Sequence, residues 1–508
     1  MTSPLTASRD TAPPAHRSPV VRGASTIALV LILTTQLMVI LDATIVTIAL
    51  PDIQNTLHFT PTSLSWVQNI YSLTFGGLLL LGARAGDILG RRRVLIGGIV
   101  LFTVASLLGG LAQSSEWLLI ARAAQGVGAA IAAPSTLALL TASFSEGPQR
   151  LKAIGLYSAV TSGGASVGLV LGGMLTDWAS WRWSLLVNVP IGIALVLLAP
   201  RYLPETERQP GRFDLSGAIT STLGMSSLVY GFVRAGSDGW SDSGTLLAFA
   251  AGVVLLTAFV MVELRASQPI TPLRMFASRE RSSSYVVRLL LVGGMFGFFF
   301  FMTQYLQDVR DYSPLKAGFA FLPMTVALFA MVRIVPKIMG RVGAKQLMVA
   351  GEGLALVGMI WLSQITTHTQ YFPGIVVPMF LMGLGMGVAF IPLTTASLAG
   401  VEPRDAGAAS GLVNVVQQVG GALGVGILVT VFGTARHNAV DHPVAGLSPV
   451  AQQHHETAHA IAAAFTGSAV FLALTFAVIV FAIRVRPPKI EAAAAMTRAE
   501  AEEAVEAV

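Results

Sequence analysis

The chain has 508 residues, of which 54% are hydrophobic and only 11% are Asp, Glu, Lys or Arg, and its mean hydropathy is +0.70. A soluble domain carries roughly 25% charged residues, so this composition excludes an ordinary soluble protein and indicates a membrane protein. The chain has no cysteine, which excludes disulfides and cysteine metal sites, and its formal net charge is +6.

Apolar runs long enough to cross a bilayer, which takes about 20 residues, recur along the whole chain. Between them lie polar segments, and residues 1–25 and 486–508 form predicted tails; the first of these lacks the features of a removed signal peptide. Length and flanking charge predict about fourteen transmembrane helices, at residues 26–50, 63–83, 94–112, 117–142, 154–175, 183–199, 215–233, 244–263, 285–306, 316–339, 346–365, 373–398, 408–432 and 461–483.

The distribution of basic residues predicts the orientation of these spans. With the amino terminus inside, 26 of the 32 Lys and Arg residues fall in segments that face the cytoplasm, and 5 fall in outside loops. This asymmetry predicts a multi-pass protein of a bacterial cytoplasmic membrane with both termini in the cytoplasm. The positive charge then contacts anionic membrane lipids, and we expect no nucleic-acid partner. Outside loop 433–460 holds five His residues, which we interpret as part of a solvated loop rather than a metal site.

The first predicted span carries Asp42 inside the apolar run TIALVLILTTQLMVILDATIVTIALP. A charge near mid-membrane costs about 2.5–3.5 kcal/mol on insertion scales, so it marks an ion or substrate pathway by default. At about 1.5 Å of rise per residue, Asp42 lies about 12 Å from the outer end of its span, and Arg122 in the fourth span lies about 8 Å from the same face. We predict that the two form a pair or share a water network that couples protons. The alternative is a structural ion pair that only joins the two spans.

The loop after the second span reads ARAGDILGRRR at residues 83–93. An aspartate ends the helix, a glycine permits a tight turn, and the arginines hold the loop at the lipid headgroups. Together with the run from Arg122 to Gly126, this loop resembles the signature loop of the major facilitator superfamily, although Ala83 stands where that loop usually has glycine. The resemblance implies that the loop gates the conformational change by clamping two halves together in the outward-facing state, and it assigns this role to Asp87, Gly90, Arg91 and Arg92.

The stretch from Leu41 to Pro51 resembles the first-span motif of the fourteen-spanner drug–proton antiporters of multidrug efflux type. The fifth span is similar to their antiporter motif in its glycines, although Leu169 stands at the position of a usual proline. Glycines four residues apart also let helices approach closely whatever the function. The resemblance covers roughly residues 25–485, includes Trp181-Arg182-Trp183 and Asn188-Val189-Pro190, and assigns conformational gating to Gly168, Gly172 and Gly173.

The resemblance implies an all-α membrane protein with the major facilitator fold. Two pseudo-symmetric six-helix bundles, at 26–200 and 266–485, would be joined by a linker at 201–265 that holds two extra transmembrane helices. The second half repeats features of the first, as internal repeats require. Gly340 to Lys345 stand where Asp87 to Arg92 stand in the first half, and GLGMG at 383–387 parallels the fourth span.

The tenth and eleventh spans carry Arg333 and Glu352, both about 10 Å from the cytoplasmic face. Successive antiparallel spans bring such residues together, so we predict a contact between them and include Glu352 among the proton-coupling residues. The alternative is that each side chain extends separately to the membrane surface.

We expect the substrate site near the middle of the membrane, between the bundles. The run MFGFFFFM at 295–302 offers the broad apolar surface that is typical of a promiscuous pocket, although packed or lipid-facing aromatics are the alternative. The candidate substrate-binding residues are Gln36, Tyr71, Met295, Phe299, Met302, Gln417 and Gln418.

These features favour a monomeric secondary antiporter that exports amphipathic small molecules, cationic ones among them, such as antibiotics or biocides. The sequence holds no GxxxxGK[ST] loop, so ATP drive is not supported, and we expect no cofactor. A proton symporter or an exporter of one metabolite on the same scaffold is the nearest alternative. A non-transporting receptor is a further alternative, but it would need no buried acid–base pair. We find no nucleophile–base arrangement and do not expect an enzyme.

Overall fold

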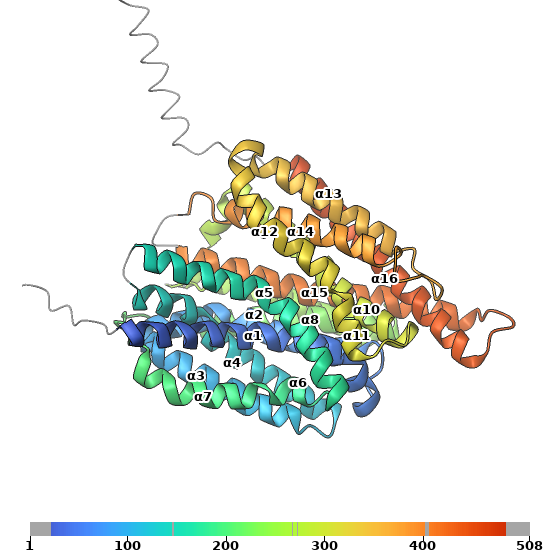
Figure 1. Cartoon of the computed structure of the whole chain (residues 1–508), viewed down its shortest axis with the longest axis horizontal. Coiled ribbons are helices and arrows are strands. Elements are labelled where there is room, and N and C mark those ends of the chain that lie inside the picture. Colours follow the sequence, from blue (N-terminus) through green and yellow to red (C-terminus); the bar gives the residue numbers. More distant parts are fainter. Residues whose placement is uncertain (1–21, 145–146, 267, 272, 402–405, 484–508) are drawn as a thin grey trace, which may run out of the picture.

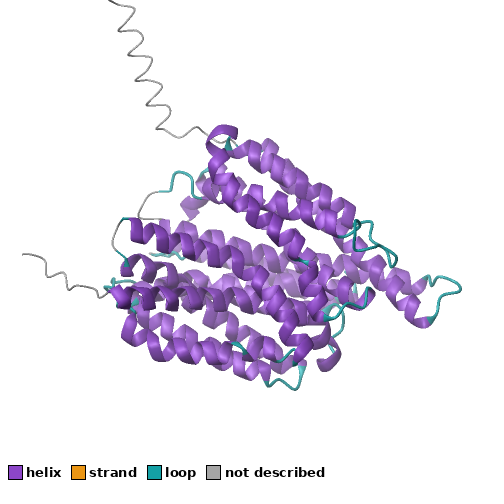
Figure 2. Cartoon of the chain, viewed as in Figure 1, coloured by secondary structure: helices purple, strands orange, loops and turns teal. Residues whose placement is uncertain are grey.

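The computed structural model describes residues 22–144, 147–266, 268–271, 273–401 and 406–483, and within these ranges the chain forms helices and loops without any strand (Figure 2). The predicted amino-terminal tail up to residue 21 and the whole predicted carboxyl-terminal tail lie outside the described residues. The helices run roughly side by side along one direction (Figure 1).

The sixteen helices assigned in these ranges include two broken pairs, α6 with α7 and α11 with α12, and α10 continues into a short π-helical turn at Tyr305–Val309. In chain order they are α1 (Arg22–Leu57), α2 (Trp66–Leu89), α3 (Arg91–Gly110), α4 (Ser115–Ser143), α5 (Pro148–Trp178), α6 (Trp183–Leu186), α7 (Asn188–Tyr202), α8 (Leu215–Asp238), α9 (Ser243–Arg265), α10 (Arg279–Gln304), α11 (Pro314–Ala320), α12 (Leu322–Val342), α13 (Ala344–Leu362), α14 (Val376–Ser397), α15 (Ala406–Asp441) and α16 (Pro449–Phe481).

Twelve helical segments of the described chain are long and apolar enough to cross a membrane. A thirteenth is α5, which bends by 40° between Thr161 and Gly163. The helix at the predicted span 215–233, α8, is 24 residues long but falls below the hydropathy of the others because Ser, Thr and Gly recur along it. The fold is therefore the predicted all-α membrane architecture, while the count of fourteen spans stays a prediction.

The helices form two groups that follow the order of the chain. In the first group α1 packs on α5, and α4 packs on both α2 and α3; in the second, α10 packs on α15 and α16, and α14 packs on α12 and α13. The two groups meet where α2 packs on α15 and α5 packs on α11. Helix α8 contacts α2 and α15, so it touches both groups, and α9 packs on α8 with most of its surface outward. The domain limits proposed from the sequence stay predictions.

Two ends of this bundle matter for function. We call the end where α1 begins and α2 ends the basic end, because the adjoining turn carries Arg91, Arg92 and Arg93. The opposite end, where α1 ends, is the distal end. At the basic end the turns after α2 and after α12 each use a glycine with positive φ, Gly90 at 101° and Gly343 at 91°. Only glycine adopts such backbone angles readily, so the corresponding turns of the two halves have the same kind of glycine conformation.

The predicted outside loop at 433–460 is largely wrong. Helix α15 continues to Asp441 and α16 begins at Pro449, so only a short connection remains, and the two helices protrude beyond the rest of the distal end (Figure 1). The segment is rich in alanine, the best helix former, which lets both helices continue past the apolar runs. The described residues hold no group of three or more His, Asp or Glu side chains placed to bind a metal ion.

Candidate functional site

A cavity of about 1170 Å³ lies between the two groups of helices. Its walls come from α1, α2, α4 and α5 on one side and from α10 and α15 on the other. At the basic end the wall includes Arg84, Asp87 and Arg91 beside the α2–α3 turn and the exposed Arg212 in the linker before α8. The cavity therefore reaches the surface at the basic end.

At the distal end the two groups close against each other. Gly173 of α5 lies so near α11 that a Cβ there would sit 2.6 Å from the backbone oxygen of Pro314, and a Cβ on Gly318 would sit 2.7 Å from that of Leu169. Gln307 donates from Nε2 to the backbone oxygen of Ile48 at 2.9 Å. Only residues without a side chain fit at such contacts, so the glycines permit the closure. Among the described residues, these contacts lie at the end opposite the cavity mouth.

The structure places six of the seven predicted substrate-binding residues in the cavity wall: Gln36, Tyr71, Met295, Phe299, Gln417 and Gln418. The placement of Met302 is wrong, because this side chain is fully buried in the core. Met302 shares a helix face with Met295 but lies about 10 Å nearer the distal end, where residues of both halves pack together and no space remains.

The aromatic run on α10 divides between the cavity and the core. Met295, Phe296 and Phe299 face the cavity, whereas Phe298, Phe300 and Phe301 are fully buried. The buried rings stack in the second half, for example on Phe432, whose ring centre lies 5.2 Å from that of Phe301. The packed-aromatic interpretation therefore holds for three of the five phenylalanines, and the cavity interpretation holds for the other two.

Asp42 is fully buried in the first half, and its carboxylate accepts hydrogen bonds from three side chains. Arg122 Nη1 donates to Oδ2 at 2.6 Å, and Gln125 Nε2 and Asn188 Nδ2 each donate to Oδ1 at 2.9 Å. A carboxylate can only accept, and all three partners are donors, so this arrangement suits the ionised form. The predicted approach of Asp42 and Arg122 is thus a direct, buried ion pair.

Arg122 stands between this carboxylate and the cavity. Its Nε donates to the backbone oxygen of Val67 at 3.0 Å, its Nη1 also bonds Gln125, and its guanidinium lies 4.4 Å from the ring centre of Tyr71. Both Arg122 and Tyr71 line the cavity, whereas Asp42 does not. A proton or a ligand in the cavity therefore meets the arginine and the tyrosine before the acid.

The predicted contact between Arg333 and Glu352 is wrong. Arg333 is exposed on α12, whereas Glu352 is fully buried on α13, and neither carboxylate oxygen has a hydrogen-bond partner among the described residues. Position 352 faces inward because the adjacent glycines of α13 and α14, Gly351 and Gly385, bring the two backbones together. Counting residues from the helix ends put the two charges at the same depth. The count does not show which side of a helix a residue faces, and here Glu352 faces inward whereas Arg333 faces outward.

The predicted gating residues of the α2–α3 turn lie at the mouth of the cavity. Asp87 and Arg91 form an ion pair there, and both line the wall. The backbone nitrogen of Arg92 donates to Glu205 at 3.0 Å, and a Cβ on Gly90 would sit 2.7 Å from the same carboxylate. The turn is thus attached to the start of the α7–α8 linker within its own half.

The glycines of α5 lie along two contacts. Gly168 and Gly172 face α1, against Thr44 and the backbone of Ile45, whereas Gly173 faces α11 of the other half. This row therefore packs beside the helix that carries Asp42 and also forms part of the distal closure. Leu169, which occupies the position of the motif's usual proline, is buried against α11. The bend of α5 lies about two helical turns before this position.

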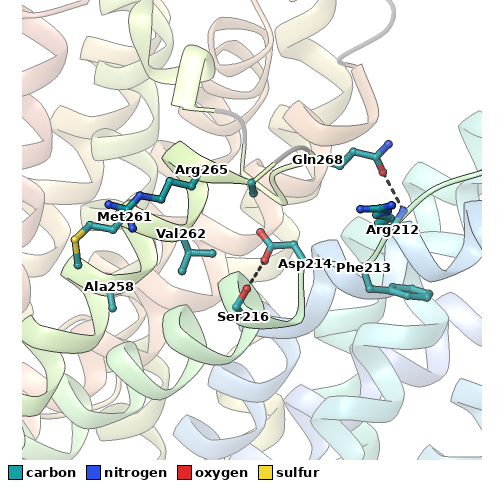
Figure 3. A pocket seen from close by; sticks show the side chains of 10 residues that line it. Arg212, Phe213, Asp214, Ser216, Ala258, Met261, Val262, Arg265 and Gln268 are labelled. Atoms are coloured by element: carbon teal, nitrogen blue, oxygen red, sulfur yellow. Dashed lines mark hydrogen bonds between the residues drawn. The ribbon is translucent and has the colours of Figure 1, made fainter.

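A second, smaller pocket of about 470 Å³ lies at the basic end, between α8, α9 and the linker before α8 (Figure 3). Gln268 accepts a hydrogen bond from the backbone nitrogen of Arg212, and Asp214 accepts one from Ser216 (Figure 3). Arg212, Asp214 and Gln268 also line the large cavity. The bond between Arg212 and Gln268 attaches the linker to the chain that follows α9, beside the cavity mouth.

Three functional candidates escaped the sequence reasoning. Gln125 and Asn188 lie in motifs that resemble the family, but the motifs assign them no role. Both are polar amides in apolar helices, which is a pattern that could have indicated partners for the buried Asp42. Arg288 lies near the start of its predicted span, which favours a position at the membrane surface, yet the structure buries it. It has no acidic partner among the described residues.

Comparison with known proteins gives consistent matches. Residues 32–425 match the family model described as Major Facilitator Superfamily. The chain is 41% identical over 415 residues to the cephamycin export protein CmcT of Amycolatopsis lactamdurans, covering 81% of this chain and 85% of that protein. It is 43% identical over 429 residues to the puromycin resistance protein pur8 of Streptomyces alboniger, covering 83% and 84%.

Among solved structures, the chain resembles a bacterial homologue of the human lysosomal transporter Spinster in an inward-facing, unoccupied conformation. The TM-score is 0.65, the sequence identity is 17%, and the match covers 91% of this chain and 98% of that one. At this identity the likeness concerns the fold alone.

Proposed function

The chain belongs to the Major Facilitator Superfamily, and we propose that it exports amphipathic small molecules, antibiotics among them, in exchange for protons. As a member of this family it is a multi-pass membrane transporter of small molecules and not an enzyme. The export and resistance named for its relatives support the outward direction of transport.

The basic end is proposed to face the cytoplasm, with both termini there and with its arginines at anionic lipid headgroups. In this orientation the cavity opens inward and can admit a substrate from the cytoplasm or the inner leaflet. The contact of α5 with α11 then forms the outer barrier, which must open for release. We propose that one chain suffices, because the cavity is built from the two halves of a single molecule.

The observation that carries proton coupling is the buried carboxylate of Asp42, whose hydrogen-bond partners among the described residues are three donors. In the inward-open state these donors favour the ionised acid, which corresponds to a state after proton release. Opening of the outer side would let a proton reach Asp42 and break its bond to Arg122. The guanidinium would then reorient toward the cavity, and re-formation of the pair on the inner side would expel the proton.

The energy suffices for useful export. A membrane potential of 100 mV supplies ~2.3 kcal/mol per charge. One pH unit adds ~1.4 kcal/mol. The sum is enough for about a few-hundredfold gradient of a neutral substrate per proton. Glu352 is proposed as a second titrating group, because its buried carboxyl group has no hydrogen-bond partner among the described residues and would meet one only if the helices around it moved.

The test uses inverted vesicles with an imposed pH gradient and a panel of fluorescent amphipathic dyes. Asp42→Asn should bind dyes but lose gradient-driven transport, because an amide cannot take up and release the proton. Asp52→Asn is the matched control, since Asp52 lies on the same helix outside the Asp42 network, and we expect it to transport like the wild type. Equal gradient-driven transport by Asp42→Asn and the wild type would refute the coupling role.

A further inference from the structure

Arg288 is a buried cation without a counter-charge. It lies nine residues into α10, about 13 Å from the basic end, and is 2% exposed. Its Nη2 donates to Thr394 at 2.7 Å, and its guanidinium lies 5.0 Å from the ring centre of Phe390. Its Nε has no partner among the described residues, and no Asp or Glu of that part of the chain pairs with it. Such a charge is costly inside a protein unless an anion joins it.

Gln417 connects this cation to the cavity. Arg288 Nη1 donates to Gln417 Oε1 at 3.3 Å, and Gln417 lines the cavity wall. An arginine can only donate, so the oxygen of the amide must face it. The NH₂ group of Gln417 therefore points away from Arg288 and is a donor for another partner. The side chain of Gln417 lines the cavity, so this partner can be a ligand in the cavity. The positive charge behind it strengthens that donor toward an anion.

The charges of the wall point in the same direction. Among the described residues, its acidic side chains are Asp87, which pairs with Arg91, and Asp214, whose carboxylate accepts from the backbone at the start of α8. Both lie near the mouth at the basic end. Deeper in the cavity the wall carries Arg122 but not Asp42. Arg122 is already paired with Asp42, so the deep wall offers hydrogen-bond donors, and its described residues include no carboxylate that could receive a cation.

We propose that the cavity selects amphipathic compounds that carry a carboxylate, with the Gln417 amide, backed by Arg288, receiving that group. The body of the compound would lie against Tyr71, Met295 and Phe299, which supply the apolar part of the wall. The proposal deepens the proposed export function by naming the substrate class, and it replaces the expectation that cations are among the preferred cargo. It rests on that function for the direction of transport, whereas binding is measured without transport.

The experiment measures equilibrium binding to purified protein in detergent. The probes are N-dansyl-phenylalanine, which carries a carboxylate, its neutral methyl ester, and the cation ethidium. The dansyl probes share one fluorophore and nearly one shape, so the ratio of their dissociation constants reports the carboxylate alone. We expect the acid to bind the wild type about tenfold more tightly than the ester, as for a charge-assisted hydrogen bond.

Two variants test the assignment in different ways. Arg288→Met removes the charge and should bring the acid and the ester to nearly equal affinity. Gln417→Glu keeps the arginine but gives it an internal carboxylate, so it should also abolish the preference for the acid even if Arg288→Met folds poorly. Arg288→Lys should retain part of the preference. Arg333→Met is the matched control, since Arg333 is exposed on α12 and is not among the residues that line the cavity, and it should leave the ratio unchanged.

The outcomes separate this inference from the export function. Equal or tighter binding of the ester or ethidium by the wild type, or a preference for the acid that survives in both Arg288→Met and Gln417→Glu, would overturn the inference. A wild-type preference for the acid that both variants abolish supports it, whether or not vesicles transport the probe. Failure of the vesicles to transport any probe under a pH gradient would count against the export function instead.

Discussion

The two halves of the molecule repeat one helix arrangement, but their buried charged residues differ in whether they have a partner of opposite charge. In the first half Asp42 and Arg122 form an ion pair at 2.6 Å, completed by two amides. In the second half Glu352 has no partner among the described residues, and Arg288 has only neutral ones. The internal repeat therefore preserved the turns and the packing glycines but not the electrostatics.

This difference indicates that the two halves have different roles in transport. A paired charge is held in place and resists change until one partner is neutralised. An unpaired charge remains able to bind something from outside the fold, a proton for a carboxyl group or an anion for a guanidinium. We interpret the first half as the part that responds to protons by breaking a pair, and the second as the part that offers binding capacity.

The largest effect should come from breaking the pair on one side. Arg122→Met leaves the ionised Asp42 buried with two amides and should destabilise the fold by about 3–5 kcal/mol, because the remaining charge is uncompensated. Thermal unfolding in detergent measures this. The double variant Asp42→Asn with Arg122→Met should recover much of the loss. A single variant as stable as the wild type would show that the pair is not held as a unit.

The matching change in the second half should behave in the opposite way. Arg288→Met removes a cation that has no acidic partner in the described part of the chain, so no unpaired charge is left behind there, and the free energy of unfolding should change by less than about 1 kcal/mol, or rise. The same unfolding assay applies. A loss as large as that of Arg122→Met would mean that Arg288 is held structurally, and the contrast between the halves would disappear.

Glu352 gives a smaller effect on stability and a separate one on transport. Glu352→Gln breaks no contact among the described residues, so unfolding should be nearly unchanged, and Glu352→Leu should be neutral or stabilising. If Glu352 titrates during the cycle, both variants should alter the dependence of dye export on the pH gradient. Unchanged export across a series of gradients would remove this residue from proton coupling.

The smallest effect belongs to a partly exposed ion pair outside both halves. Arg234 donates to Asp242 at the turn between α8 and α9, and this hydrogen bond lowers the pKa of Asp242 to about 2. A lowered pKa means that the contribution is present above the ordinary value of 3.8 and is lost as pH falls toward 2. At neutral pH this contribution is present, but solvent screens the partly exposed pair, so Asp242→Asn should lower the free energy of unfolding only slightly. A large change would contradict the view that burial gives the other pairs their effect.

The sequence predicted much of this molecule for definable reasons. Hydropathy located the spans, because the bilayer demands long apolar helices and nothing else in a chain produces them at that spacing. Charge in an apolar run located Asp42 and Arg122, and depth counting placed them at one level. The same method failed for Arg333 and Glu352, because rise along a helix gives depth but says nothing of which side a residue faces when two helices rotate against each other.

The amino-acid sequence by itself determined the class of the protein, its helices and the residues that cannot be solvated in a membrane. Only the tertiary structure decided their partners. Asn188 donates a hydrogen bond to Asp42, which lies 146 positions earlier in the chain, and Gln417 accepts one from Arg288, which lies 129 positions earlier. Met302 is buried in the core and does not line the cavity, because the two halves pack together around it. Burial is a property that a residue's own neighbours in sequence largely set, whereas hydrogen bonds between helices depend on their packing in three dimensions, which no local pattern encodes.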